Sequence, residues 1–547
     1  MAQPVASPGS RDTQHHPAAR ADRRWMVLAV VAVAQLMVVL DSTIVNIALP
    51  SAQHALGFAN SDRQWVVTAY ALAFGSLLLV GGRLGDMYSR NWVLITGLVG
   101  FAVASAIGGA AASFQMLVAA RALQGAFGAI LAPSALGTLV STFQDPRDRN
   151  RAFAVFGAVA IAGSAVGLIL GGLLTQYLSW RYTLFVNLLF AAIAAAGALV
   201  YIRGSRPVTP PRMDWPGAVL ACAGLFLIVF GFSQAETAGW TAPLTLGSLI
   251  LGAVLLAVFV VAEQRSSHPL LPLRIILDRT RGGAYAAVGI TGIAIFGVFL
   301  FLTFYMQQVK GYSPLTTGLL FLPLAAGILV SSTLYSALPG IGARPLVTAG
   351  MLLGCGGTAY LAQLTVSSSY AADVLPALLV MGLGFGMIFG PAINTATAGV
   401  PRQDSGVASA LVNTMQQVGG SVGISILSTV AASAATSYLS AHHTGPQAPA
   451  IAATHGYTLA FTISAALLGL GAILAILMLP SRNRLEERAG EGPALIPEPE
   501  VAAPALAPQR ELTSAPHPAV KVMPVGLLCC SPVIDPGLPP AAAKPSL

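Results

Sequence analysis

Two ionisable residues lie inside long apolar segments, where charges are rare. Asp41 stands in the segment LDSTIVNIALP (residues 40–50), and Arg121 stands in RALQG (residues 121–125). A charge in the middle of a hydrocarbon layer costs roughly 2.5–3.5 kcal/mol on insertion scales, so these two residues are the first candidates for a function. A carboxylate there can take up a proton from one side of the membrane and release it on the other. We expect proton coupling by this pair; a static ion pair that packs two helices is the alternative.

The composition predicts an α-helical membrane protein. Of 547 residues, 55% are hydrophobic and only 9% are charged, whereas soluble domains carry about 25% charged residues. Several apolar stretches have the length of about 20 residues that a helix needs to cross roughly 30 Å of hydrocarbon. The predicted fold class is an all-α polytopic membrane protein, and a water-soluble fold is excluded.

The hydropathy pattern predicts fourteen spanning segments. They cover residues 25–49, 64–83, 92–112, 115–139, 152–174, 182–202, 216–234, 244–263, 284–306, 316–336, 345–365, 373–394, 406–431 and 457–479. The glycines and arginines of the turn at 82–90 are partly repeated in Gly340, Gly342 and Arg344. This weak internal repeat favours a chain of two related halves. The expected parts are a disordered arm at 1–24, six-helix bundles at 25–202 and 266–480, an inserted helix pair at 203–265, and a disordered tail at 481–547.

Arginine residues predict the orientation, because cytoplasmic loops retain positive charge. Alternate loops carry Arg83, Arg90, Arg147, Arg149, Arg151, Arg203, Arg206, Arg212, Arg265, Arg274, Arg279, Arg281, Arg344 and Arg402. The other loops carry only Arg63, Arg181 and Lys310. Both termini are therefore expected in the cytoplasm, and the Ala-rich, Lys-poor composition suits the plasma membrane of a high-GC bacterium.

The sequence lacks the residues that several other classes of protein need for their function. The only lysines are Lys310, Lys521 and Lys544, so no Gly-Lys-Ser/Thr phosphate loop exists, and the energy source is expected to be an ion gradient. The four cysteines have no metal-site or disulfide spacing. The net charge of +8 is distributed over short loops and forms no basic face for nucleic acid. We expect no cofactor, no metal, no enzymatic activity, and a monomer whose partners are lipid, protons and a small molecule.

The turn between the second and third predicted segments concentrates glycines and charges. Gly82, Arg83, Gly85, Asp86 and Arg90 fall within nine residues. Asp86 is placed to cap one helix N-terminus, and Arg90 to face a neighbouring C-terminus. We interpret this turn as a conformational latch, with a simple solvated turn as the alternative.

Small and polar residues within other predicted segments suggest where helices meet. Gly163, Gly167, Gly171 and Gly172 lie in the fifth segment, with a spacing that lets two helix backbones approach closely. They predict either tight packing alone or a moving seam between the halves. The candidates for a substrate cavity, each of which is also able to join two helices, are Asn46, Gln124, Tyr305, Gln307, Gln308, Asn394, Asn413, Gln416 and Gln417.

These motifs resemble those of the major facilitator superfamily, in particular its fourteen-spanner drug:proton antiporter family. The resemblance rests on LDSTIVNIALP, RALQGAFGA and the turn at 82–90, together with WRYTLFVN (180–187), QQVKGYSP (307–314) and GVASALVNTMQQVGGSVG (406–423). It covers about residues 25–480. Two departures stand out: Leu168 replaces the proline that the family has after Gly167, and Met87, Ser89 and Asn91 replace a basic residue, a glycine and a basic residue.

The resemblance implies two six-helix bundles plus an inserted pair, alternating access, and proton-coupled export of hydrophobic or amphipathic small molecules. It also implies proton-coupling roles for Asp41 and Arg121. Because Asp41 is the only deeply placed acid, a neutral, anionic or monocationic substrate is expected rather than a dication. Two alternatives stay open: export of an endogenous metabolite, such as a self-made antibiotic or an amino acid, and a non-transporting receptor or scaffold.

Overall fold

The computed structural model describes residues 17–143, 145–202, 214–266, 269–337, 341–398, 400, 405–441 and 445–480. The predicted tail at 481–547 and the first sixteen residues of the predicted arm lie outside the described residues.

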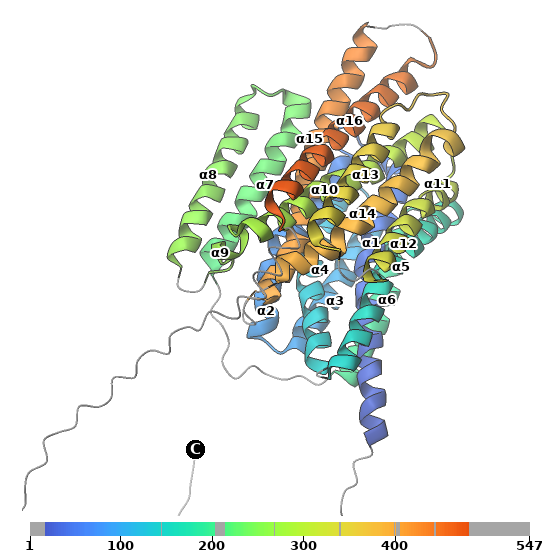
Figure 1. Cartoon of the computed structure of the whole chain (residues 1–547). Coiled ribbons are helices and arrows are strands. Elements are labelled where there is room, and N and C mark those ends of the chain that lie inside the picture. Colours follow the sequence, from blue (N-terminus) through green and yellow to red (C-terminus); the bar gives the residue numbers. More distant parts are fainter. Residues whose placement is uncertain are drawn as a thin grey trace, which may run out of the picture. The chain divides into compact units, whose positions relative to one another are not determined.

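The described chain consists of helices joined by short connections (Figure 1). They are α1 (Pro17–Leu56), α2 (Gln64–Met87), α3 (Arg90–Gly109), α4 (Phe114–Thr142), α5 (Pro146–Tyr177), α6 (Tyr182–Tyr201), α7 (Trp215–Ala238), α8 (Pro243–Arg265), α9 (Leu273–Ile276), α10 (Arg279–Phe304), η1 (Tyr305–Val309), α11 (Pro314–Leu320), α12 (Leu322–Ala337), α13 (Ala343–Leu361), η2 (Tyr370–Val374), α14 (Leu375–Thr397), α15 (Ser405–Ala441) and α16 (Ala448–Met478). The η elements are π-helical turns that continue α10 and precede α14.

Thirteen helical segments within the described ranges are long and apolar enough to cross a membrane. The remaining predicted segment, 345–365, forms α13, a helix of 19 residues. Arg344 and four glycines make α13 less apolar than its neighbours. It nevertheless packs against α14 and α16. The prediction of an all-α membrane protein with about fourteen spanning segments is confirmed.

Short polar side chains set several helix starts. Ser113, Asp145, Asp214, Asp278 and Ser313 each accept a hydrogen bond from a backbone N–H in the first turn of the helix that follows. A helix leaves its first four N–H groups without intrahelical partners, and a capping side chain satisfies one or more of them. These caps therefore fix the starts of α4, α5, α7, α10 and α11.

The first helix extends further than the hydropathy pattern predicts. α1 begins at Pro17, inside the arm predicted to be disordered at 1–24. Proline suits a first helical position, and the three alanines at 18, 19 and 21 favour helix, so the apolar helix extends backwards through them. At its other end α1 continues through Pro50 to Leu56, which membrane helices tolerate when neighbouring groups satisfy the freed carbonyl.

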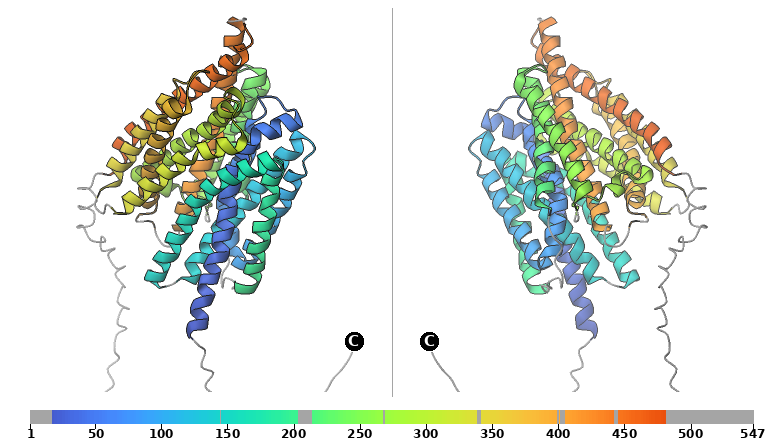
Figure 2. Two further views of the ribbon diagram at one scale, coloured as in Figure 1. Left: turned by 90° about the vertical axis from the view of Figure 1, so that its right-hand side faces the viewer. Right: turned by 90° about the vertical axis from the view of Figure 1, so that its left-hand side faces the viewer.

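Many of the helix contacts fall within two groups, α1–α6 and α10–α16, which we call the N-terminal and the C-terminal half. Within the first half α4 packs against α2 and α3, and α1 against α5 and α6; within the second, α14 packs against α12 and α13, and α10 against α15 and α16. The halves touch mainly through α2 with α15 and α5 with α11. The α7–α8 hairpin lies beside α15 (Figure 2) and also contacts α2.

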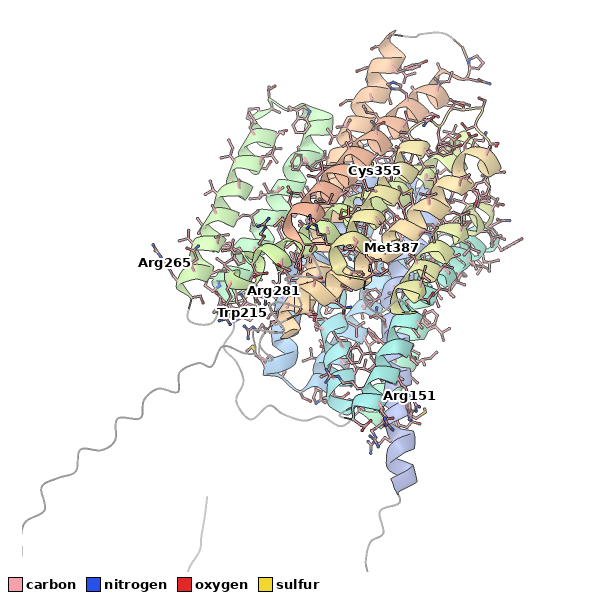
Figure 3. All side chains as sticks on the ribbon, viewed as in Figure 1. Arg151, Trp215, Arg265, Arg281, Cys355 and Met387 are labelled. Carbon is pink, nitrogen blue, oxygen red and sulfur yellow. The ribbon has the colours of Figure 1, made fainter. Side chains whose placement is uncertain are left out.

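Three of the arginines predicted on the cytoplasmic side lie towards the same end of the helices (Figure 3). Figure 3 shows Arg151, Arg265 and Arg281 at or near the lower ends of α5, α8 and α10, while Cys355 and Met387 lie further along α13 and α14. A positive end of this kind is the arrangement on which the positive-inside rule relies. The orientation itself stays a prediction.

Candidate functional site

The two deeply placed charges form an ion pair. Nη1 of Arg121 on α4 lies 2.6 Å from Oδ2 of Asp41 on α1. The other carboxylate oxygen, Oδ1, accepts hydrogen bonds from Gln124 Nε2 at 3.0 Å and from Asn187 Nδ2 at 2.7 Å. Each of these four residues is at most 1% exposed. Asp41 is thus a fully buried carboxylate with three hydrogen-bond donors from two other helices.

The guanidinium of Arg121 is also held from several sides. Its Nε donates to the carbonyl of Val66 at 3.1 Å, and its Nη1 also donates to Gln124 Oε1 at 2.8 Å. The ring of Tyr70 lies 4.4 Å from the guanidinium carbon, a cation–π distance. Gln124 in turn donates to Ser105 Oγ at 2.7 Å. The network therefore joins α1, α2, α3, α4 and α6.

This network makes the buried charges tolerable. Arg121 and Gln124 are three residues apart, which places both side chains on one face of α4. Two buried charges pay a large desolvation penalty, and only close pairing with further hydrogen bonds offsets it. We call the six residues that provide these side-chain contacts the charge cluster: Asp41, Tyr70, Ser105, Arg121, Gln124 and Asn187.

The charge cluster contains one group that could accept an added proton. The guanidinium of arginine stays protonated in proteins, so a proton that enters the cluster must bind the carboxylate of Asp41. Protonated Asp41 no longer neutralises Arg121, and the tie between α1 and α4 weakens. Whether a proton at Asp41 is linked to the packing of the N-terminal half stays a prediction.

Three members of the charge cluster were not identified from the sequence, namely Tyr70, Ser105 and Asn187. Asn187 carried a signal, since it is a carboxamide inside an apolar helix and ends the motif WRYTLFVN. Gln124 was predicted to line a substrate cavity, and in the structure it forms hydrogen bonds with both charged side chains. Direct proton coupling by Asp41 and Arg121 stays a prediction.

The predicted latch lies where α2 ends and α3 begins. Arg83 Nη2 donates to the carbonyl of Pro269 at 3.0 Å, in the connection between α8 and α9. Gly82 and Gly85 pack against α4 near Pro133 and Ser134. The side chains of Asp86 and Arg90 lie outside the described residues, and the N-cap position of α3 is Ser89. The contact of Arg83 ties this turn to the connection that follows α8.

The glycines of α5 face two different neighbours. Gly163, Gly167 and Gly171 lie against α1; a Cβ on Gly171 would come within 2.9 Å of the side chain of Ile44. Gly172 faces α11 instead, where an added Cβ would lie 2.5 Å from Leu315 Cα. Leu168, in the place of the family's proline, is buried, and its carbonyl lies close to Gly318 of α11. One side of α5 thus packs within its half, and the other forms the seam between halves.

Substitutions of these glycines are expected to separate the two kinds of packing. Gly172→Ala forces the backbone of α11 away, so we expect it to disfavour the closed seam by about 1–3 kcal/mol. Gly171→Ala is expected to lower the thermal stability of the N-terminal half with less effect on the seam. The readout for the seam is cross-linking of Gln176→Cys to Leu315→Cys by a short bis-maleimide, since Leu315 N donates to Gln176 Oε1 at 3.3 Å.

Gly157→Ala is the matched control on the same helix, because nothing lies within 4 Å of its added Cβ. It should leave both cross-linking and thermal stability unchanged or slightly improved. Equal losses of cross-linking in Gly171→Ala and Gly172→Ala would contradict the division of α5 into two faces.

The other predicted cavity residues are dispersed. Gln307 Nε2 donates to the carbonyl of Ile47 at 3.0 Å and so joins the two halves, whereas Tyr305 is buried with its hydroxyl on Thr365 O. Asn46 donates back to its own helix at Ser42 O. Gln308, Asn394 and Asn413 are exposed, while Gln416 and Gln417 are half-buried on α15. Their role in a substrate cavity stays a prediction.

A second buried cation was predicted only as a loop charge. Arg63, directly before α2, lies with its guanidinium carbon 4.2 Å from the ring of Phe304, 5.4 Å from Tyr457 and 6.0 Å from Phe301. Its Nη1 donates to the hydroxyl of Tyr457 at 3.2 Å. Its Nε has no hydrogen-bond partner among the described residues. We call these three rings the aromatic cage; they come from α10 and α16, so Arg63 connects the two halves.

Metal binding has no visible site in the described ranges, where no group of three or more His, Cys, Asp or Glu side chains could hold an ion. What remains is a set of membrane helices around a buried, hydrogen-bonded ion pair. Ionisable residues of this kind mark proton relays and substrate pathways in membrane transporters. Fold and site together define a secondary membrane transporter.

Residues 31–424 match the family model of the Major Facilitator Superfamily, and the chain belongs to that family. Over 472 residues it is 45% identical to a puromycin resistance protein of Streptomyces alboniger, covering 86% of this chain and 94% of that protein. Over 416 residues it is 39% identical to a cephamycin export protein of Amycolatopsis lactamdurans, covering 74% and 85%. The resemblance inferred from the motifs is confirmed.

Solved structures share the fold at low sequence identity. An auto-inhibited peptide transporter of the POT family superposes with a TM-score of 0.60 at 16% identity, covering 84% of this chain and 96% of that one. A bacterial homologue of the human lysosomal transporter Spinster gives a TM-score of 0.57 at 16% identity, covering 86% and 98%.

Proposed function

We propose that this protein is a proton-coupled efflux transporter of the plasma membrane that exports hydrophobic or amphipathic antibiotics by alternating access. The observation that carries the proposal is the charge cluster, which gives one buried carboxylate the means to couple a proton to helix packing. The relatives support transport out of the cell, since two of them are a puromycin resistance protein and a cephamycin export protein.

In the proposed cycle Asp41 takes a proton from outside and releases it inside while the substrate cavity changes sides. One elementary charge moved through about 100 mV provides roughly 2.3 kcal/mol. Each tenfold solute gradient costs about 1.4 kcal/mol. One proton therefore supports a substrate gradient of roughly fifty-fold. Both termini lie in the cytoplasm in this scheme, and the transporter acts as a monomer without enzymatic activity.

A resistance panel in a sensitive bacterial host tests the function. Puromycin is the first compound, with lincomycin and tetracenomycin C beside it, because relatives are named for resistance to each. We expect raised resistance to at least puromycin, and loss of it in Asp41→Asn. Export of one compound alone would favour a dedicated exporter of an endogenous antibiotic over a multidrug transporter.

The receptor or scaffold alternative makes a different prediction in proteoliposomes. When substrate is added to vesicles that hold a pH gradient, a proton-coupled transporter moves protons across the membrane in exchange for substrate. A scaffold does not. Absence of both resistance and substrate-dependent proton flux in folded protein would overturn the proposal.

A further inference from the structure

A cavity of about 540 Å³ lies apart from the charge cluster, between α2, α4 and α7. Trp65, Ser76 and Leu77 of α2 contribute to its wall, with Gln115 of α4 and Cys222 of α7. Its volume falls within the range of about 300–1,000 Å³ that is typical of sites for small organic ligands. The wall provided by α7 exists only because the inserted pair packs against the N-terminal half.

The cavity runs along the helix axes from the end of the helices towards their middle. On α2 its lining extends from Trp65, the second helical residue, to Leu77, a rise of about 18 Å for twelve residues. On α4 the lining starts at Phe114, the first helical residue, and reaches Ala122. This length corresponds to one leaflet, because half of the hydrocarbon layer is about 15 Å thick.

The chemistry of the wall changes along that length. Trp65 and the exposed Gln115 stand at the mouth, where helices begin, and tryptophan is common at the level of lipid headgroups. At the deep end the Cys222 thiol donates to the carbonyl of Ser76 at 3.6 Å, and Ser76 Oγ to that of Ala73 at 3.5 Å. The remaining lining residues are apolar. A polar ligand would lose its hydrogen bonds to water here without replacement, whereas a hydrocarbon chain would not.

We propose that this cavity binds one acyl chain of a membrane phospholipid, with the headgroup at the mouth formed by Trp65 and Gln115. The proposal is independent of which compound is exported. The inserted pair then has a structural role, because α7 forms the third wall of a lipid site whose other two walls are α2 and α4.

The bound chain lies directly behind the charge cluster. Ala69 of α2 lines the cavity one position before Tyr70, and Ala122 of α4 lines it one position after Arg121. Neighbouring faces of the same two helices, about 100° apart, therefore contact the acyl chain and hold the guanidinium. The lipid braces the helices that position Arg121.

Photo-cross-linking with a defined lipid tests the site. The full-length protein is placed in phosphatidylcholine nanodiscs that contain a phosphatidylcholine with a diazirine in the middle of one acyl chain, and adducts are mapped by mass spectrometry. We expect adducts concentrated on the cavity wall, at Leu72, Cys222 and Phe226. Ala119→Trp fills the cavity from the exposed face of α4 and should reduce these adducts to the level of the surrounding lipid.

Val103→Trp on the exposed face of α3 is the matched control and should leave the adducts unchanged. If Ala119→Trp fails to fold, Ala119→Leu is used, with a smaller expected loss. Adducts spread evenly over the exposed faces of α3, α6 and α8 would overturn the proposal, since they would indicate ordinary surrounding lipid. Displacement of the adducts by puromycin would also overturn it, and would assign the cavity to substrate instead.

Discussion

Replacing Asp41 by asparagine is expected to abolish substrate-dependent proton flux and to destabilise the protein. The asparagine side chain does not take up and release a proton near neutral pH, so coupling between proton and substrate is lost. Arg121, with 1% exposure, also loses its only close counter-charge within the described residues. Leaving one member of a buried ion pair unpaired costs about 3–5 kcal/mol. We therefore expect both a flux at background level and a clearly lower melting temperature.

A double variant separates coupling from stability. Asp41→Asn combined with Arg121→Gln removes both buried charges, so much of the stability should return, because no charge is then left buried without a counter-charge. Proton flux should stay at background. The measurements are thermal unfolding in detergent and fluorescence of a pH-sensitive dye enclosed in proteoliposomes.

Asp145→Asn serves as the control for loss of an acid, because Asp145 is an exposed N-cap and asparagine caps helices equally well. It should retain normal flux and stability. A double variant that is folded and still moves protons with substrate would remove Asp41 from the coupling mechanism.

Hydropathy predicted the spanning segments because the bilayer imposes a minimum length on every apolar helix. It could not predict helix ends that leave the hydrocarbon. α15 continues to Ala441 and α16 begins at Ala448, whereas the apolar pattern places these limits near 431 and 457. Beyond the bilayer, helix propensity and contact between the two helices decide where they end, and the ring pair of Tyr438 and His455 lies in this extension.

The charge cluster was predictable only in its two charged members. Asp41 and Arg121 are conspicuous because each is a charge within an apolar run. Asn187 is as fully buried as Asp41, yet a single amide in a helix is as compatible with helix packing as with a site. Its role depends on a contact across 146 residues of chain, which no local pattern contains.

Arg63 illustrates the same limit more strongly. Its position in a short loop between two predicted segments made it one of the few positive charges on the side expected to face outside. The structure shows it to be 7% exposed and enclosed by rings more than 200 residues away in sequence. Loop position predicted its depth along the membrane, whereas its burial depends on the C-terminal half.

Replacing Arg63 by lysine is expected to open the contact between the two halves at this end of the helices. The variant keeps the positive charge but loses the planar group that stacks on Phe304. An ammonium group is also more strongly hydrated than a guanidinium, so its burial without a carboxylate is less favourable. A desolvated cation–π contact contributes about 1–2 kcal/mol, which corresponds to a roughly tenfold shift towards the open arrangement.

The shift is measured by the bis-maleimide cross-link between Gln176→Cys and Leu315→Cys, which reports the seam between α5 and α11. Arg63→Lys should lower the cross-linking yield, and Tyr457→Phe, which retains the ring and loses only the hydrogen bond of 3.2 Å, should lower it less. If the charge alone mattered, Arg63→Lys would behave like the parent protein. Unchanged cross-linking in Arg63→Lys would therefore show that stacking in the aromatic cage does not hold the halves together, and that the seam depends on α5 and α11 themselves.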